Sequence, residues 1–196
     1  MSSFDDLMAQ MQRHNMKLPT EREMVRLPNA KPLLHSVMTH FLSLENKPLQ
    51  WLPEYDQVAN WLTDNQGRGL FLYGNCGRGK SLLTRHVLPA ILLGGLRKVV
   101  NVYDIQDMNR ELDELLTKRF IALDDVGTEE VINHFGNRRM AFAEVMDVAE
   151  KQGKLLIISS NLQQQELLER YGQRVVDRLK AITQRVLFVG NSLRTS

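Results

Sequence analysis

The sequence predicts an α/β fold of three layers, in which a mostly parallel five-stranded sheet lies between helices. From about residue 50 onward, short apolar segments alternate with segments of helical periodicity. The strand-like segments are residues 69–73, 98–103, 119–124, 154–159 and 185–189. The helical segments lie near residues 79–93, 104–117, 136–152 and 163–180. This alternation is typical of a parallel sheet covered on both faces, and right-handed crossovers bring the carboxyl ends of its strands to one edge.

Residues 1–46 differ in composition from the rest, because they are rich in methionine and interrupted by prolines. We expect a helical N-terminal extension there and the main domain over residues 47–196. Three helices are predicted in the extension, over residues 4–11, from Thr20 to Leu27 and over 33–41, and another over 53–63 opens the main domain. The second begins with a capping-box pattern, Thr20-Glu21-Arg22-Glu23. The first is amphipathic, and it either packs on the chain's own core or docks on a partner protein.

The composition is that of an ordinary globular protein, with 196 residues of which 43% are hydrophobic and 24% charged. No apolar run approaches the length of a membrane span, and Asp5 and Asp6 stand where a signal peptide would be basic, so we expect a cytoplasmic protein without a membrane partner. A single cysteine, Cys76, excludes an internal disulfide. It is either a small filler residue or a thiol activated by a helix N-terminus. The five histidines show no metal-ligand spacing, so no zinc site is expected.

A phosphate-binding loop is predicted directly after the first strand of the sheet. The sequence there is Gly74-Asn75-Cys76-Gly77-Arg78-Gly79-Lys80-Ser81, followed by Leu82 and a helical segment. Glycines let the backbone approach phosphate groups closely, and the N–H groups at the start of the helix bind the anion. In such a loop Lys80 reaches the β- and γ-phosphates and Ser81 binds Mg²⁺. We therefore expect residues 74–82 to bind a nucleotide together with Mg²⁺.

Two further strand ends carry polar residues suited to phosphate chemistry. Asp124 and Asp125 follow the apolar segment 120–123, and we expect Asp124 to bind the metal through water and Asp125 to orient or deprotonate the attacking water. Asn161 follows the next strand and either hydrogen-bonds the γ-phosphate or the water, or caps a helix. Because these strands are expected to be parallel, their ends should lie at the edge that also carries the phosphate loop.

The charge pattern indicates less about function than the motifs do. A formal net charge of +2 does not by itself indicate a nucleic-acid partner. The segment after Asn161 is locally basic, with six basic residues against three acidic ones. Its basic residues are Arg170, Arg174, Arg178, Lys180, Arg185 and Arg194. Arginine is suited to phosphate recognition and to completing an active site, although a solvated helical face explains part of this set equally well.

Taken in order, these motifs resemble the AAA+ ATPases of the DnaC helicase-loader and IstB transposition-helper group. The resemblance covers roughly residues 50 to 194. It rests on the phosphate loop and then on the segments Leu123-Asp124-Asp125-Val126-Gly127, Ile158-Ser159-Ser160-Asn161-Leu162 and Tyr171-Gly172-Gln173-Arg174-Val175-Val176-Asp177-Arg178-Leu179. The last of these is the most specific. The resemblance implies a P-loop AAA+ sandwich that binds ATP, and since nothing in this sequence matches the helical lid that many AAA+ proteins carry, we expect a fold without it.

The resemblance also implies roles for single residues. Asn161 matches the sensor of the γ-phosphate, and Arg178 matches the arginine finger that reaches the nucleotide of a neighbouring subunit. Arg174 lies one helical turn before Arg178 on the same face. Arg194, at the end of the final strand segment, resembles a second sensor arginine that contacts the nucleotide.

The function implied is that of an ATP-dependent replication protein of the helicase-loader type. Such a protein would hydrolyse ATP at the interfaces of a homo-oligomer while it assembles on single-stranded DNA and delivers a replicative DNA helicase. The alternative within the same group is a transposition helper of the IstB kind, which acts on duplex DNA with a transposase. A small-molecule kinase and a nucleotide-binding module without turnover are two further readings outside this group.

Overall fold

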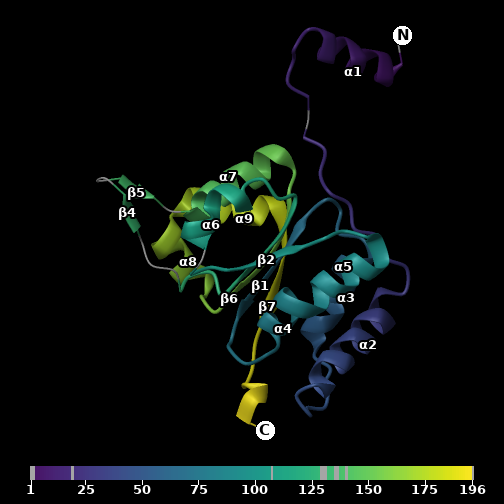
Figure 1. The fold of residues 1–196 in the computed structure, drawn as a ribbon, viewed down its shortest axis with the longest axis vertical. Coiled ribbons are helices and arrows are strands. Elements are labelled where there is room, and N and C mark those ends of the chain that lie inside the picture. The colour runs from purple at the N-terminus through teal and green to yellow at the C-terminus, as the bar shows by residue number, and fades with distance from the viewer. Residues whose placement is uncertain are drawn as a thin grey trace.

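The computed structural model describes residues 3–18, 20–106, 108–128, 132–134, 137–139 and 141–195, and its centre is a parallel sheet with helices on both faces (Figure 1). The strands, in their order across the sheet, are β2 (Asn101–Asp104), β3 (Phe120–Asp124), β6 (Leu155–Ser160), β1 (Gly69–Gly74) and β7 (Thr183–Phe188). All four neighbouring pairs are parallel. The predicted three-layer α/β fold is therefore confirmed.

The sheet separates two hydrophobic cores, and β1 contributes to both. Leu70 and Leu72 belong to one core, whereas Phe71 belongs to the other, because successive side chains of a strand point to opposite faces. The first core also contains α2 (Ala30–Ser43), α3 (Pro53–Thr63) and α5 (Leu88–Leu96). The second contains α6 (Met108–Leu115), α7 (Ala141–Gln152), α8 (Gln164–Tyr171) and α9 (Gln173–Ile182). Burial on both faces explains why the central strands are continuously apolar.

The remaining elements are short or lie outside this sandwich. The loop after β1 leads into α4 (Lys80–Leu82), which continues through a π-helical segment (Leu83–Val87) into α5. A hairpin is formed by β4 (Ile132–His134) and β5 (Asn137–Arg139), and a 3₁₀ turn covers Leu193–Thr195. The first helix, α1 (Phe4–Arg13), lies apart from the sandwich (Figure 1). None of its residues is buried, and its N-terminus has a capping box between Ser3 and Asp6.

The prediction of a helix starting at Thr20 is wrong, because residues 20–27 form no helix. Polar groups along this segment, including the two side chains that a capping box would use, are engaged elsewhere in the fold. Thr20 Oγ1 donates to the carbonyl oxygen of Lys151 over 2.9 Å, and the amide of Val25 donates to Asn65 Oδ1 over 2.8 Å. The Glu23 carboxylate pairs with Lys98 at 2.7 Å and also with Arg119. Tertiary contacts therefore override a local helix-start signal that the sequence presents clearly.

Two other predicted helices have different bounds. The segment expected to be helical over 136–152 begins its helix only at Ala141, because residues 137–139 pair as a strand with residues 132–134. The helix expected over 163–180 is divided into α8 and α9 at Gly172. Gly172 has a φ of +80°, which ends a right-handed helix at little cost only because the residue is glycine.

The extension and the main domain share a core. Leu34 and Met38 of α2 are fully buried against the same cluster as Leu88 of α5. A domain boundary at residue 46 stays a prediction. Of the two helices described within residues 1–46, α2 has buried residues and α1 has none. Within the described ranges, no helix is both long enough and apolar enough to cross a membrane.

Candidate nucleotide-binding site

The loop between β1 and α4 has the backbone geometry of a phosphate cradle. Gly74, Gly77 and Gly79 have φ values of +104°, +75° and +84°. A side chain at Gly77 would also collide with the C-terminal segment, since its Cβ would lie 2.0 Å from Ser192 Oγ. Glycine is therefore required here both by the backbone conformation and by the close approach of a second segment.

The Lys80 side chain curls back onto this loop. Only 4% of the residue is exposed, and its Nζ donates to the carbonyl oxygens of Gly74 at 2.9 Å and Asn75 at 2.7 Å. Burial lowers the pKa of the Lys80 ammonium, while the nearby acidic groups of Cys76, Asp125 and Asp124 act in the opposite direction. The ammonium group thus lies inside the cradle, hydrogen-bonded to carbonyl groups that a phosphate oxygen can replace as its partners.

Asp124 ends β3 and is almost completely buried, with 2% of the residue exposed. Its Oδ1 accepts a hydrogen bond from the Ser159 hydroxyl, and its Oδ2 lies 2.5 Å from Nε of Arg85. Arg85 also pairs with Asp104 at the end of β2. Sequence reasoning missed Arg85, because an arginine four residues after Ser81 in a helix carries no motif that links it to a carboxylate 39 residues away.

Asp125 and Asn161, which follow neighbouring strands, are brought together. Asn161 Nδ2 donates to Asp125 Oδ1 over 2.9 Å. The Asp125 backbone has a φ of +58°, and its amide donates to Ser159 Oγ over 3.0 Å. Ser159 therefore connects the two aspartates, since it accepts from the amide of Asp125 and donates to the carboxylate of Asp124. Sequence reasoning did not single out this serine.

The Arg78 side chain points away from the phosphate cradle. Its Nη2 lies 3.1 Å from Glu54 Oε1, and its Nη1 donates to the carbonyl oxygen of Asn191 over 3.0 Å. Both side chains of the Arg78–Glu54 pair are at most 10% exposed. Of the predicted cofactor-binding residues, Arg78 thus offers a phosphate its backbone rather than its guanidinium group.

A second residue of α3, Tyr55, also contacts the loop. Tyr55 donates its hydroxyl to the carbonyl oxygen of Arg78 over 3.1 Å. Burial raises the pKa of Tyr55 to about 12, so it is a hydrogen-bond donor at neutral pH. Glu54 and Tyr55 were missed by sequence reasoning, because they lie before the motif and on a different element.

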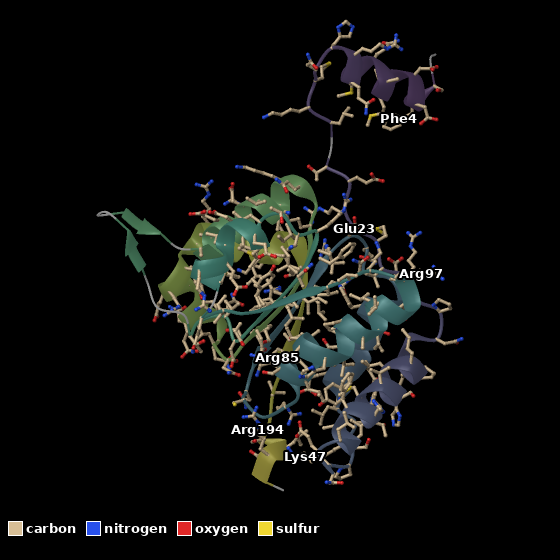
Figure 2. All side chains as sticks on the ribbon, in the orientation of Figure 1. Phe4, Glu23, Lys47, Arg85, Arg97 and Arg194 are labelled. Atoms are coloured by element: carbon tan, nitrogen blue, oxygen red, sulfur yellow. The ribbon has the colours of Figure 1, made fainter. Side chains whose placement is uncertain are left out.

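The segment after β7 closes the other side of the loop. Asn75 donates its amide to the carbonyl oxygen of Phe188 and its Nδ2 to that of Gly190, each over 2.9 Å. The amide of Leu193 donates to the carbonyl oxygen of Gly77, also over 2.9 Å. Arg194 follows directly in the C-terminal 3₁₀ turn and is exposed (Figure 2). Its positive charge is among the influences that lower the pKa of Lys80.

Arg178 lies in a different environment. Its side chain is 17% exposed and pairs with two acidic residues of α7, Glu150 at 2.8 Å and Asp147 at 2.5 Å. Arg174 on the same helix is 80% exposed and only 3.8 Å from Asp147. In the single chain, therefore, Arg178 is held by α7, and its role as a finger toward a neighbouring subunit stays a prediction.

The residues of this site fit a magnesium-bound nucleotide. The loop supplies N–H groups and an ammonium group for phosphates, while the Ser81 hydroxyl and the Asp124 carboxylate are oxygen ligands of the kind Mg²⁺ prefers. Within the described residues, no group of three or more His, Cys, Asp or Glu side chains is placed to hold a metal. A metal held jointly by protein and phosphate oxygens is the arrangement that this donor set suits.

The fold is shared with the solved structures of the DnaC helicase loader and of DnaI. The structure of the DnaC helicase loader aligns with a TM-score of 0.53 and 18% sequence identity, covering 84% of this chain and 93% of that one. The structure of DnaI aligns with a TM-score of 0.52 and 20% identity, covering 64% of this chain and 72% of that one. No family model and no curated protein matches the sequence. The likeness is one of fold, and it agrees with the three-layer P-loop sandwich predicted from the sequence.

Proposed function

We propose that this chain is a Mg²⁺-dependent ATPase of the DnaC-like helicase-loader type. The observation that carries this proposal is the convergence of the glycine loop, Lys80, Asp124, Asp125 and Asn161 at the carboxyl ends of three neighbouring strands. A phosphate cradle alone supports nucleotide binding. Two aspartates and an amide beside it support hydrolysis, because they offer a metal ligand, a group that takes up a proton and a hydrogen-bond donor for the reacting water.

Each residue has a distinct part in the proposed reaction. The loop amides and Lys80 bind and orient the phosphates. Ser81 directly and Asp124 through water would hold Mg²⁺, which when bound neutralises negative charge on the phosphate oxygens. Asp125 orients the attacking water and accepts its proton. Asn161 holds the Asp125 carboxylate through its amide and is placed to sense the γ-phosphate. Catalysis of this kind depends on positioning and electrostatics, so small displacements of these groups should reduce turnover strongly.

A basic groove along the open edge of the sheet supports DNA binding. It measures about 480 Å³ and lies against β7, with Arg68, Lys180 and Arg185 in its wall. Within the described ranges, none of these three side chains has an ion-pair partner. Tyr73 lines the same groove. Unpaired cations beside an aromatic ring suit the phosphates and bases of a single nucleic-acid strand.

Assembly into a homo-oligomer is the second part of the proposal. The Arg178 guanidinium would leave Asp147 and Glu150 and complete the nucleotide site of the next subunit. An arginine supplied in this way is worth ~10³–10⁵ in rate in related phosphoryl-transfer systems. A monomer should therefore hydrolyse ATP slowly, and assembly on single-stranded DNA should accelerate hydrolysis.

A replicative DNA helicase is the proposed client, and α1 is the proposed docking element within residues 1–46. The solved structure described as the DnaC helicase loader shares the fold, which supports this client. Phe4 and Leu7 of α1 are 73% and 48% exposed, so the helix offers apolar side chains to a partner. An IstB-like transposition helper remains the alternative, and comparing the affinities for single-stranded and duplex DNA discriminates between the two.

The proposal is tested by measuring ATP turnover at several protein concentrations with and without single-stranded DNA. We expect turnover that rises with both and disappears in Lys80→Ala. Turnover that is sensitive to Lys80→Ala but independent of both would contradict the assembly step and leave only an ATPase.

A further inference from the structure

Arg85 bridges two carboxylates at the ends of neighbouring strands. Its Nε lies 2.5 Å from Asp124 Oδ2, and its Nη2 pairs with Asp104 Oδ1. Asp104 and Asp124 are register partners in the parallel pair of β2 and β3, so their carboxylates emerge side by side. Arg85 lies in the π-helical segment that follows α4, one turn beyond Ser81 (Figure 2). This places it at the carboxyl ends of β2 and β3. π-Helical segments of this kind are frequent at functional sites.

The burial of Asp124 makes this contact electrostatically important. A carboxylate with 2% exposure and a second carboxylate beside it needs a positive charge nearby. Among the described residues, Arg85 is the cation paired with Asp124, and the other partner of that carboxylate is the neutral hydroxyl of Ser159. The Arg85 side chain is 35% exposed and that of Asp104 is 45% exposed. The contact with Asp104 therefore faces solvent, whereas the Asp124 side chain is buried.

Arg85 and a divalent cation would offer positive charge to the same carboxylate. Asp124 is proposed to bind the metal through water, and its Oδ2 is already engaged by the guanidinium group. A free divalent cation therefore has to displace Arg85 or accept a nearby positive charge, and both are unfavourable. Nucleotide phosphates change this balance, because they bring negative charge and oxygen ligands next to Ser81. Asp104 can retain Arg85 when Asp124 releases it.

From this geometry we infer that Arg85 is a positioning residue that serves as the resident counter-ion of the metal site. It holds the Asp124 carboxylate ready in the absence of nucleotide and prevents a divalent cation from binding alone. The metal then enters only together with the nucleotide. This inference rests on the proposed function, because it assigns Asp124 to the metal.

The inference is tested without relying on turnover by titrating the full chain with Mn²⁺. Electron paramagnetic resonance of the free ion measures how much Mn²⁺ is bound. Without nucleotide we expect weak binding in wild type and binding that is tighter by about tenfold or more in Arg85→Gln, since the unit positive charge paired with Asp124 is removed. Arg85→Lys keeps the charge but cannot bridge both carboxylates, so its affinity should lie between these two. Arg97→Gln removes an exposed arginine at the end of α5 and should match wild type.

A second titration contains an ATP analogue that cannot be hydrolysed. Wild type should then bind Mn²⁺ tightly, and the difference in Mn²⁺ affinity between wild type and Arg85→Gln should become smaller. Tight Mn²⁺ binding by wild type without nucleotide overturns the inference, and this result needs no variant to fold. Equal affinities in wild type and a folded Arg85→Gln overturn it as well. If wild type binds neither the analogue nor Mn²⁺ in its presence, the proposed function fails and the inference falls with it.

Discussion

Asn161 Nδ2 donates a hydrogen bond to Asp125 Oδ1 over 2.9 Å, which joins the ends of two adjacent strands. The partners lie 36 residues apart in the sequence and meet only because β3 and β6 are parallel and in register. Asp125 has a left-handed backbone conformation, an arrangement that is uncommon for a residue other than glycine and is often found at functional sites. The contact fixes the orientation of the carboxylate proposed to act on water.

Replacing Asn161 by alanine should therefore reduce turnover without abolishing nucleotide binding. Loss of the amide leaves the Asp125 carboxylate without its hydrogen-bond donor, so we expect ATP turnover to fall by about tenfold to a hundredfold. Binding of an ATP analogue should change little. Asn60→Ala, an exposed asparagine of α3, is the matched control. Wild-type turnover in Asn161→Ala would show that this residue is only a structural cap.

The buried pair of Arg78 and Glu54 should contribute to the stability of the nucleotide loop. Glu54→Ala leaves the Arg78 guanidinium buried without its counter-charge, so the free energy of unfolding should drop by roughly 3–5 kcal/mol. Urea denaturation measures this change. Glu45→Ala removes an exposed carboxylate paired with Lys47 and should leave the urea midpoint unaltered.

A double replacement, Glu54→Leu with Arg78→Met, separates the charge from the packing. It removes both ionic groups, so much of the stability lost in Glu54→Ala should return. If the double variant is as unstable as the single one, the hydrogen bonds to Asn191 and Val189 matter more than the ion pair.

The basic groove predicts which arginine and lysine contribute to DNA affinity. Removing Lys180 and Arg185 together, each as glutamine, should weaken binding to a single-stranded oligonucleotide. It should also lower the slope of log K against log salt by about 0.7 for each lost phosphate contact. Fluorescence anisotropy across a salt series measures both quantities. Arg97→Gln should leave them at the wild-type values, and an unchanged slope in the double variant would place the DNA elsewhere.

Replacing Arg178 should affect stimulated turnover rather than nucleotide binding. Arg178→Ala should abolish the stimulated turnover while an ATP analogue still binds, because the residue contacts α7 in its own chain. Asp147→Asn weakens the hold of α7 on Arg178 but keeps the arginine. If Arg178 has to move to a neighbouring subunit, Asp147→Asn should retain or raise the stimulated turnover. A loss in both variants would instead indicate that Arg178 only braces α7 and α9.

The sequence allowed prediction of those parts of the fold and site that depend on local patterns. Apolar segments predicted the parallel sheet. The glycine loop, Asp124, Asp125 and Asn161 could be proposed as site residues because each directly follows a strand. Contacts between distant segments were not predictable in this way. The extended path of residues 20–27 depends on Asn65 and Lys151, which a capping-box pattern cannot take into account.

Arg85 was missed for the same reason as the pair of Arg78 and Glu54. Charged residues at ordinary helix positions give no signal until the fold shows which carboxylate lies opposite. Asp104 and Asp124 become neighbours only through the pairing of β2 with β3, and that pairing decides where the Arg85 guanidinium lies.

The loop from Gly74 to Ser81 is proposed to bind ATP through Lys80 together with Mg²⁺. Isothermal titration calorimetry of the full chain with a non-hydrolysable ATP analogue and Mg²⁺ tests it most directly. We expect one site per chain in wild type and a loss of binding in Lys80→Ala. This variant should keep the fold, because the hydrogen bonds described for the ammonium go to two loop carbonyls. Equal affinity in wild type and in a folded Lys80→Ala, or no binding by either, would contradict the account.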